Sequence, residues 1–283
     1  MKLATFTEGG RTRIGVVTGE EIVDLAAAAP DLPQSMPEFL AAGPAALDRA
    51  RRATGPQLRL ADAKLEAPVP SPRKFLAVGL NYADHIEETG REKPDFPMFF
   101  NKQVTCVNAP FDPVELPPSG KYTDYEGELA FVIGQRCRHV PRERAHEVIA
   151  GYTIVDDVSV RDWQQKSATM TLGKSWDTHG PMGPWIVTPD EISDPHALEL
   201  KTLVNGELRQ HSNTKHLIFD CFDQVATLST VFTLEPGDVI STGTPSGVGV
   251  AMNPRGFLNA GDVVRIEIAE IGHIEHTIVA APA

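Results

Sequence analysis

The segment from Tyr125 to Gly134 constrains the fold of this chain most, because two acids stand at the mouth of an apolar strand. It reads YEGELAFVIG, so Glu126 and Glu128 are separated by one glycine. Side chains two residues apart on a strand share a face, and both carboxylates are therefore expected on one side. The apolar run that follows predicts a strand buried in a β-rich core.

A third acid is expected to join this pair. The run from 152 to 155 (YTIV) predicts a neighbouring strand that ends at Asp156 and Asp157. Adjacent strand residues face opposite sides, so only one of the two aspartates can join, and the pattern does not choose between them. Three converging carboxylates repel one another unless a cation neutralises them, and Mg²⁺, Mn²⁺ or Ca²⁺ suits an all-oxygen site. The alternative is a solvated edge strand beside a capped turn.

The remaining pattern predicts an α+β chain rich in strands. Short strands at 2–6, 13–17 and 21–25 are separated by glycine turns, and Ala/Pro-rich sequence from 26 to 56 favours short helices. The prolines at 68, 70 and 72 predict a boundary, which gives a small N-terminal β-rich domain at 1–70 and a catalytic domain at 71–283. In the second domain we expect strands at 75–80, 128–133, 151–155, 239–240 and 263–268, a hairpin turn at 205–206 and a helix at 219–231.

Composition excludes several classes of function. A net charge of -12 disfavours nucleic acid as a partner, because such binding needs basic residues that neutralise phosphates. No apolar run reaches the roughly 18 residues of a membrane span, and the first ten residues do not resemble a signal peptide, so a cytoplasmic protein without a membrane partner is expected. Cys106, Cys137 and Cys221 are odd in number and far apart, which predicts buried free thiols.

Six motifs occur in an order that resembles the fumarylacetoacetate hydrolase superfamily, in its branch of bacterial acylpyruvate and diketo-acid hydrolases and hydroxymuconate-type isomerases. They are VGLNYADH (78–85), FFNK (99–102), DYEGEL (124–129), DVSVRD (157–162), GKS (173–175) and TGTPSGVG (242–249). The resemblance covers the chain from about residue 70 to its end and implies a mixed β-roll fold and a homodimer. It also implies Mg²⁺ or Mn²⁺, with Ca²⁺ as an alternative, bound by Glu126, Glu128 and Asp157.

His85 and Glu88 lie three residues apart, so one helical turn would place both on one face. A carboxylate that bonds one imidazole nitrogen makes the other a better proton acceptor, which suits a base and its orienting partner. The resemblance implies that this pair lies on a mobile lid, that Lys174 stabilises an oxyanion and that Gln164 orients substrate or water. The alternative for the pair is an ordinary surface helix.

Three further residues are candidates for substrate binding. Lys102 and Arg161 are expected either to bind the acid group of the substrate or to balance the carboxylate cluster, and structural ion pairs are the alternative. Thr244 lies in the glycine-rich loop 242–249, where backbone amides and its hydroxyl would meet substrate oxygens. That loop lacks the Gly-Lys-Ser/Thr ending of a nucleotide-binding loop.

Together these features predict a divalent-metal-dependent hydrolase acting on carbon–carbon bonds in ketonic substances, such as those of aromatic or sugar acid catabolism. The expected substrate is a small β-diketo acid of the acylpyruvate or fumarylacetoacetate type, cleaved through a metal-bound enolate by water that His85 activates. One alternative is an isomerase or decarboxylase of a 2-hydroxy-diene-dioate or an oxaloacetate-like acid. Another is a catalytically silent metal-binding scaffold, which is disfavoured because His85, Glu88 and Lys174 are all present.

Overall fold

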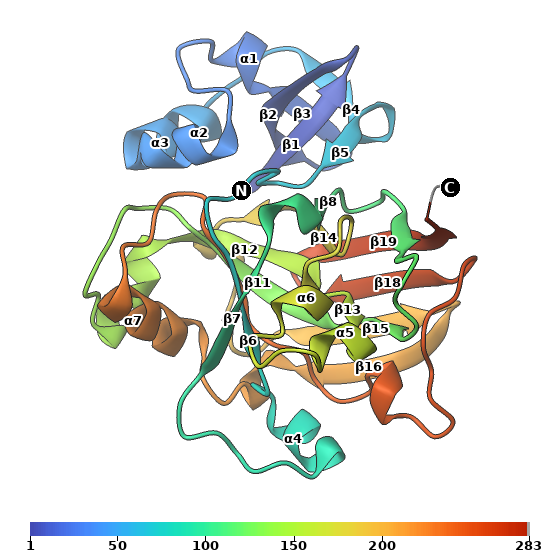
Figure 1. Cartoon of the computed structure of the whole chain (residues 1–283). Helices are drawn as coiled ribbons and strands as arrows, with labels where there is room; N and C mark the ends of the chain where they lie inside the picture. Colours follow the sequence, from blue (N-terminus) through green and yellow to red (C-terminus); the bar gives the residue numbers. More distant parts are fainter. Residues whose placement is uncertain (282–283) are drawn as a thin grey trace.

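The first strands form where glycine lets the chain reverse. In the computed structural model, which describes residues 1–281, Gly9, Gly10 and Gly19 adopt positive φ between successive antiparallel strands. Three short helices follow, and together they make the small unit at the top of Figure 1. Its elements are β1 (Lys2–Glu8), β2 (Arg11–Thr18), β3 (Glu21–Asp24), α1 (Leu25–Ala28), α2 (Met36–Ala41), α3 (Pro44–Arg51), β4 (Gln57–Arg59) and β5 (Lys64–Glu66).

This unit continues into a large mixed sheet. The order of its strands is β4-β3-β2-β1-β14-β12-β11-β17-β6-β7, with β5 paired to β1 and β8 paired to β14. The strands not yet defined are β6 (Phe75–Gly79), β7 (Met98–Lys102), β8 (Val107–Asn108), β11 (Gly127–Ile133), β12 (Ile149–Asp156), β14 (Gly180–Val187) and β17 (Val239–Ser241).

A second sheet packs against the centre of the first. It has five strands in the order β16-β15-β18-β19-β9, and β10 pairs with β13 in a separate ribbon. These strands are β9 (Val114–Leu116), β10 (Thr123–Asp124), β13 (Ser159–Val160), β15 (Glu199–Val204), β16 (Glu207–Asn213), β18 (Val263–Ile268) and β19 (Gly272–Ala280). The helices of this body are α4 (Ala83–Thr89), α5 (Arg161–Gln164), α6 (Thr171–Lys174) and α7 (Cys221–Val231), and α4 lies at the lower end of Figure 1. The β-rich mixed fold predicted from the sequence is confirmed.

Strand β11 is apolar on both faces because both faces are covered. Leu129 and Phe131 pack into the core shared with the five-stranded sheet, whereas Ala130 and Val132 pack into the core on the other side. Gly127 faces the five-stranded sheet so closely that a Cβ atom there would lie 2.3 Å from the Thr202 hydroxyl oxygen. The glycine between the two glutamates is therefore required by packing.

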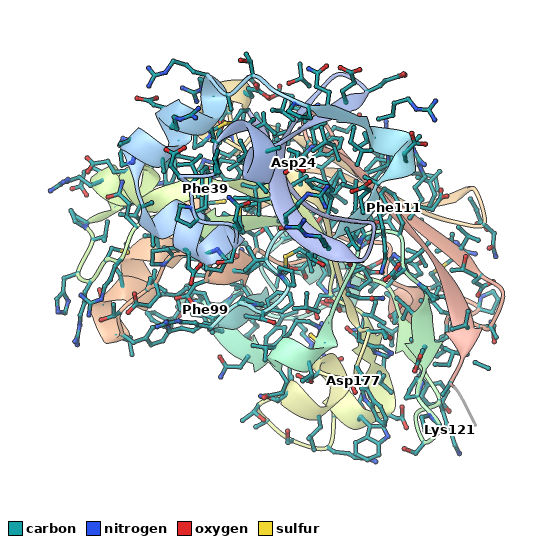
Figure 2. The ribbon with its side chains drawn as sticks, turned by 90° about the horizontal axis from the view of Figure 1, so that it is seen from above. Asp24, Phe39, Phe99, Phe111, Lys121 and Asp177 are labelled. Atoms are coloured by element: carbon teal, nitrogen blue, oxygen red, sulfur yellow. The ribbon has the colours of Figure 1, made fainter. Side chains whose placement is uncertain are left out.

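The N-terminal unit shares its core with the large sheet. Leu3 and Phe39 belong to the same buried cluster as Val132, Val155 and Met182. Figure 2, seen from above, shows this unit with Asp24 and Phe39 labelled on it. The division into domains at residue 70 stays a prediction.

Helix α7 begins two residues later than the sequence predicts. The carboxylate of Asp220 accepts hydrogen bonds from the backbone nitrogens of Phe222 and Asp223, and the Asp223 side chain accepts from the Asp220 nitrogen. This capping box fixes the first turn, so Phe219 stays outside the helix. No helix within residues 1–281 is long and apolar enough to cross a membrane.

Candidate metal and active site

Three buried carboxylates meet where β11 begins and β12 ends. One oxygen from each of Glu126, Glu128 and Asp157 lies within 4.8 Å of the others. The register of the two antiparallel strands produces this, because Gly127 pairs with Asp156 and the acids on either side of that pair project to the same face. The sequence expectation that a neighbouring strand brings an aspartate beside the two glutamates is met.

Asp156 lies on the opposite face and has another task. Its Oδ1 accepts a hydrogen bond from the Glu126 nitrogen at 2.9 Å, and its Oδ2 lies 3.0 Å from Nε2 of His276 on β19. All of these atoms are buried. The alternation of strand side chains thus separates the two aspartates: Asp157 joins the cluster and Asp156 binds the second sheet.

Three basic side chains surround the carboxylates. Lys174 Nζ donates to Glu126 Oε2 at 2.6 Å and to Asp157 Oδ2 at 2.7 Å. Lys102 Nζ donates to Asp157 Oδ1 at 2.7 Å, and Arg161 Nη1 donates to Glu126 Oε1 at 2.6 Å. Charge-assisted hydrogen bonds of this length hold buried carboxylates in fixed positions.

These cations act unequally on the two glutamates. Burial would raise the pKa of Glu126, but the charges of Lys174 and Arg161 outweigh it and lower that pKa to about 2. Burial and the neighbouring charges of Asp157 and Glu126 raise the pKa of Glu128 well above its ordinary value. The protein's own cations therefore do not compensate the full negative charge at Glu128, and a bound divalent cation would supply what is missing.

Two close glycine contacts set the position of Lys174 and the loop opposite. A Cβ at Gly173 would lie 2.3 Å from the Gln164 nitrogen, so only glycine lets α6 pack on α5. Gly243 adopts φ 102°, and its nitrogen donates to Glu128 Oε2 at 2.8 Å. The GKS and TGTPSGVG motifs thus shape the cluster through their backbones as well as their side chains.

Helix α4 carries His85 and Glu88 over the site. His85 Nδ1 lies 3.1 Å from Glu88 Oε2, with exposed side-chain fractions of 12% and 22%. The other oxygen, Glu88 Oε1, accepts from the Gly247 nitrogen at 2.9 Å. At the start of the helix, Asp84 Oδ2 accepts from the Ser212 hydroxyl at 2.6 Å. The helix is therefore fastened at two points to segments that follow far later in the chain.

A cavity of about 580 Å³ lies beneath α4. Its lining includes most of the residues that the sequence singled out, namely His85, Glu88, Glu126, Arg161, Gln164, Lys174 and Thr244. Apolar side chains of Met98, Phe100 and Met170 line it as well. A small molecule in this cavity would contact Glu126 of the carboxylate cluster, the His85 imidazole and the Lys174 ammonium group together.

Lys102 and Thr244, both predicted to bind substrate, have hydrogen-bond partners within the protein. The Lys102 side chain is fully buried, does not line the cavity, and also donates to the carbonyl oxygens of Lys174 and His179. Of its two expected roles, the geometry favours charge balance. The Thr244 hydroxyl borders the cavity, but it donates to the Gly127 carbonyl at 3.1 Å and accepts from Gln210 at 2.8 Å.

Asp124 and Ser241 also shape the site, and the sequence reasoning gave them no role. Asp124 Oδ2 accepts from Arg161 Nε at 2.8 Å, and the same carboxylate caps the nitrogens of Gly249 and Val250. The Ser241 hydroxyl donates to Glu128 Oε2 at 2.6 Å. Asp124 lies within the DYEGEL motif, so its position beside the acid pair was the available signal.

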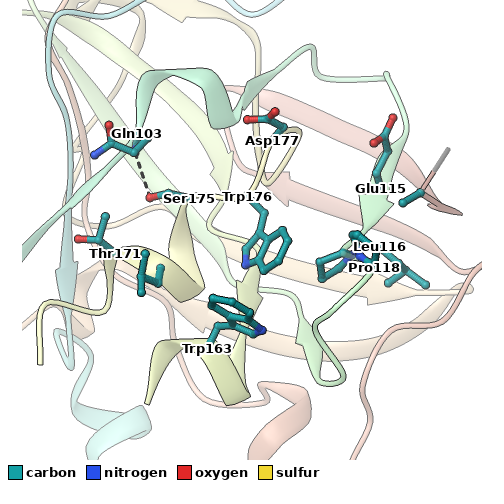
Figure 3. A pocket seen from close by; sticks show the side chains of 12 residues that line it. Gln103, Glu115, Leu116, Pro118, Trp163, Thr171, Ser175, Trp176 and Asp177 are labelled. Atoms are coloured by element: carbon teal, nitrogen blue, oxygen red, sulfur yellow. Dashed lines mark hydrogen bonds between the residues drawn. The ribbon is translucent and has the colours of Figure 1, made fainter. Parts of the chain in front are cut away.

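A second cavity lies on the other side of α5 and α6 (Figure 3). It measures about 450 Å³ and is bordered by Trp163 and Trp176, whose rings meet edge to face with centroids 5.2 Å apart. None of the three clustered carboxylates lines it. The site chemistry therefore belongs to the cavity beneath α4.

Comparison with known proteins agrees with this geometry. Residues 74–279 match the family described as fumarylacetoacetate (FAA) hydrolase C-terminal, and residues 1–68 match the family described as Rv2993c-like, N-terminal. A relative from Xenopus laevis, named oxaloacetate tautomerase fahd2, mitochondrial, is 43% identical over 288 residues, covering 99% of this chain and 90% of its own.

Solved structures of both hydrolases and isomerases share the fold. A fumarylacetoacetate hydrolase from psychrophilic Exiguobacterium antarcticum is 39% identical with a TM-score of 0.88, covering 99% of this chain and 100% of its own. A 5-carboxymethyl-2-hydroxymuconate delta-isomerase from Mycobacterium smegmatis (36%, TM-score 0.81) and a maleylpyruvate hydrolase from Sphingobium sp. SYK-6 in complex with manganese(II) and pyruvate (35%, TM-score 0.80) each cover 100% of both chains. The family model matches most of the chain and the relatives cover nearly all of it, so the chain belongs to the fumarylacetoacetate hydrolase family of enzymes.

Proposed function

We propose that this protein is a divalent-metal-dependent enzyme that interconverts the keto and enol forms of a small oxaloacetate-like 2-oxo acid. The observation that carries the proposal is the convergence of Glu126, Glu128 and Asp157 within 4.8 Å of one another, beside a cavity that Glu126, His85 and Lys174 line. The relative named oxaloacetate tautomerase, 43% identical over 99% of this chain, supports the choice of reaction.

The three carboxylates fit a hard divalent cation. All donors are oxygens, and the raised pKa of Glu128, caused by burial and by its charged neighbours, indicates a deficit of positive charge. We infer Mg²⁺ or Mn²⁺, with Ca²⁺ as an alternative, and the manganese in the maleylpyruvate hydrolase structure supports this assignment. When bound, such an ion would polarise the 2-oxo acid as a Lewis acid.

His85 is the proposed base. If Nδ1 carries the proton that Glu88 accepts, Nε2 is free to take a proton from the methylene carbon beside the keto group. The proton then returns to the oxygen that becomes the enol hydroxyl, so the reaction is balanced without water. The ammonium group of Lys174 borders the same cavity and would stabilise negative charge that develops on the substrate oxygen.

Hydrolysis of an acylpyruvate-like diketo acid is the second candidate. The same His85–Glu88 pair would remove a proton from water instead of carbon, and the water would attack the distal carbonyl. The fold neighbour named maleylpyruvate hydrolase, 35% identical over the full chain, supports this reading. Decarboxylation of an oxaloacetate-like acid is a further outcome to test, since it begins from the same polarised 2-oxo acid.

The first experiment follows the ultraviolet absorbance of the enol of oxaloacetate after chelation of the protein and after restoration of Mn²⁺ or Mg²⁺. Parallel assays measure cleavage of an acylpyruvate and release of pyruvate by decarboxylation. Metal-restored acceleration of keto–enol exchange supports the tautomerase. Cleavage into two acids without such acceleration would replace it with the hydrolase, and no metal dependence in any assay would refute both.

We further propose that the protein is a cytoplasmic homodimer, as expected from the family resemblance and the sequence composition. Light scattering on the purified protein measures the mass in solution. A mass of one chain would refute the dimer.

A further inference from the structure

Three basic side chains line the cavity beneath α4, and only one has no acidic partner. Lys174 pairs with Glu126 and Asp157, and Arg161 pairs with Asp124 and Glu126. Within residues 1–281, Arg91 forms no salt bridge, and its side chain makes no hydrogen bond. A guanidinium at a cavity without a partner carboxylate is available to an anionic ligand.

Arg91 belongs to the same segment as the proposed base. Gly90 ends α4 in the left-handed conformation with φ 62°, and the Arg91 nitrogen then donates to the Ile86 carbonyl at 3.3 Å. This turn fixes the backbone of Arg91 relative to His85 and Glu88, which border the same cavity. The exposed Arg91 side chain itself supports no neighbour, so its role is separable from the structure of the helix.

We propose that Arg91 binds the far carboxylate of the substrate and so restricts the enzyme to dicarboxylic 2-oxo acids. This inference rests on the proposed function, in which a cation bound by Glu126, Glu128 and Asp157 would polarise the 2-oxo acid at that end of the substrate. A substrate with a second carboxylate then places that group in a cavity where Arg91 is the cation not already neutralised. Paired guanidinium and carboxylate groups form two parallel hydrogen bonds, which gives selectivity by charge and by shape.

The other polar groups of the cavity do not replace this cation. Gln165 and Ser167 are neutral, and the Gln164 oxygen already accepts from Arg161 Nη1 at 3.1 Å. A monoanionic acid of the same length therefore loses the Arg91 contact and gains no equivalent one. The structure thus assigns discrimination between mono- and dicarboxylic acids to one residue of the α4 segment.

The test compares malate with lactate, which differ by the far carboxylate and are not turned over as keto acids. Calorimetric titration of each into the Mn²⁺-loaded protein gives the dissociation constant. In Arg91→Gln, malate binding is expected to weaken about tenfold and lactate binding to stay unchanged. Arg91→Lys keeps the charge but loses the paired hydrogen bonds, so its affinity for malate is expected to lie between those of the wild type and Arg91→Gln.

Lys93→Gln is the matched control, because Lys93 is exposed on the same loop and does not line the cavity. It should leave both affinities unchanged. Equal weakening of malate and lactate in Arg91→Gln, or no weakening of malate, would overturn the inference while metal-dependent keto–enol exchange persists. If the wild-type protein shows no such exchange and binds neither acid, the proposed function itself fails and the inference fails with it.

Discussion

Replacing Glu128 by glutamine is expected to stabilise the metal-free protein and to remove its response to manganese. Glu128 is 1% exposed, and the charges of Asp157 and Glu126 together with burial raise its pKa well above the ordinary value. A group whose folded-state pKa is raised costs stability at every pH above its unfolded pKa, and the cost grows until the pH passes the folded value. At pH 8 the neutral glutamine avoids this cost.

The geometry keeps glutamine acceptable at this position. Its oxygen can accept from the Ser241 hydroxyl and the Gly243 nitrogen, as Glu128 Oε2 does, and its amide can donate to the neighbouring carboxylates. Replacing a buried ion pair by neutral groups of similar volume stabilises proteins by about 1–4 kcal/mol in favourable cases, and we expect the change of the single Glu128 carboxylate to lie in the lower half of that range. For a chain of this size, each kcal/mol shifts the melting temperature by about 2–4 °C. In EDTA, Glu128→Gln should therefore melt several degrees above the wild type.

In manganese, the wild type should instead be more stable than Glu128→Gln. A ligand at about 100 times its dissociation constant stabilises the folded state by about 2.7 kcal/mol, so the wild type should gain roughly 5–10 °C. Glu128→Gln loses one anionic ligand and should gain little. Thermal unfolding in EDTA and in Mn²⁺ measures both effects. Glu87→Gln is the control, because it makes the same change at an exposed residue outside the cluster and the cavity and should keep the full manganese response.

A variant Glu128→Gln that is less stable than the wild type in EDTA and keeps the full manganese response would refute the reasoning. It would mean that the Glu128 carboxylate is neither short of positive charge nor part of the cation site. A loss of the manganese response in Glu87→Gln as well would show that the assay does not report on the cluster.

Three further predictions concern the base and the cations. His85→Ala should retain the manganese-dependent stabilisation and lose turnover by about 10²–10⁴, with Glu87→Ala on the same helix as the unaffected control, and kinetics with thermal unfolding check both. Lys102→Met should lower the free energy of unfolding in EDTA by about 3 kcal/mol, because it removes the buried cation at Asp157 Oδ1 and leaves Lys174 as the remaining partner of that carboxylate. Denaturant titration measures this, and a change below about 1 kcal/mol would contradict it. Lys174 and Arg161 hold the pKa of Glu126 in the folded protein at about 2, so the ionised carboxylate stabilises the fold above its unfolded pKa, and this stabilisation is lost as the pH falls toward the folded pKa. Glu126→Gln should therefore flatten the decline in the free energy of unfolding from about pH 5 to 2. An unchanged decline would contradict this prediction.

Local patterns in the sequence sufficed for part of the strands, β11 and β12 among them, and for the acid pair, whereas β7, β14 and β19 were not predicted. The alternation around Glu126 and Glu128 depends only on residues of one strand, so the shared face follows from strand geometry. Likewise, the proline and glycine positions marked the turns of the N-terminal unit. The start of α7 was missed by two residues because the competing signal, the Asp220 cap, outweighs the apolar spacing that includes Phe219.

Contacts between segments far apart in the chain could not be predicted from the local sequence pattern. The choice between Asp156 and Asp157 depends on which face of β12 the five-stranded sheet covers, and that sheet includes His276, 120 residues away. The role of Lys102 depends on Asp157, 55 residues away, which turns an apparent substrate-binding cation into a buried partner of the cluster. The family resemblance chose Asp157 without this information, and the geometry supplies the physical reason.

The two faces of the β11–β12 pair connect the five-stranded sheet to the chemistry of the site. Glu126 is held from both sides, since its nitrogen donates to Asp156 on one face and its carboxylate accepts from Lys174 and Arg161 on the other. His276 bonds Asp156 and therefore acts on the position of Glu126 without contact with the cavity. A change in the packing of β19 should consequently alter cation affinity at the cluster even though every proposed ligand is intact, because the backbone that aims Glu126 is fixed from the opposite sheet.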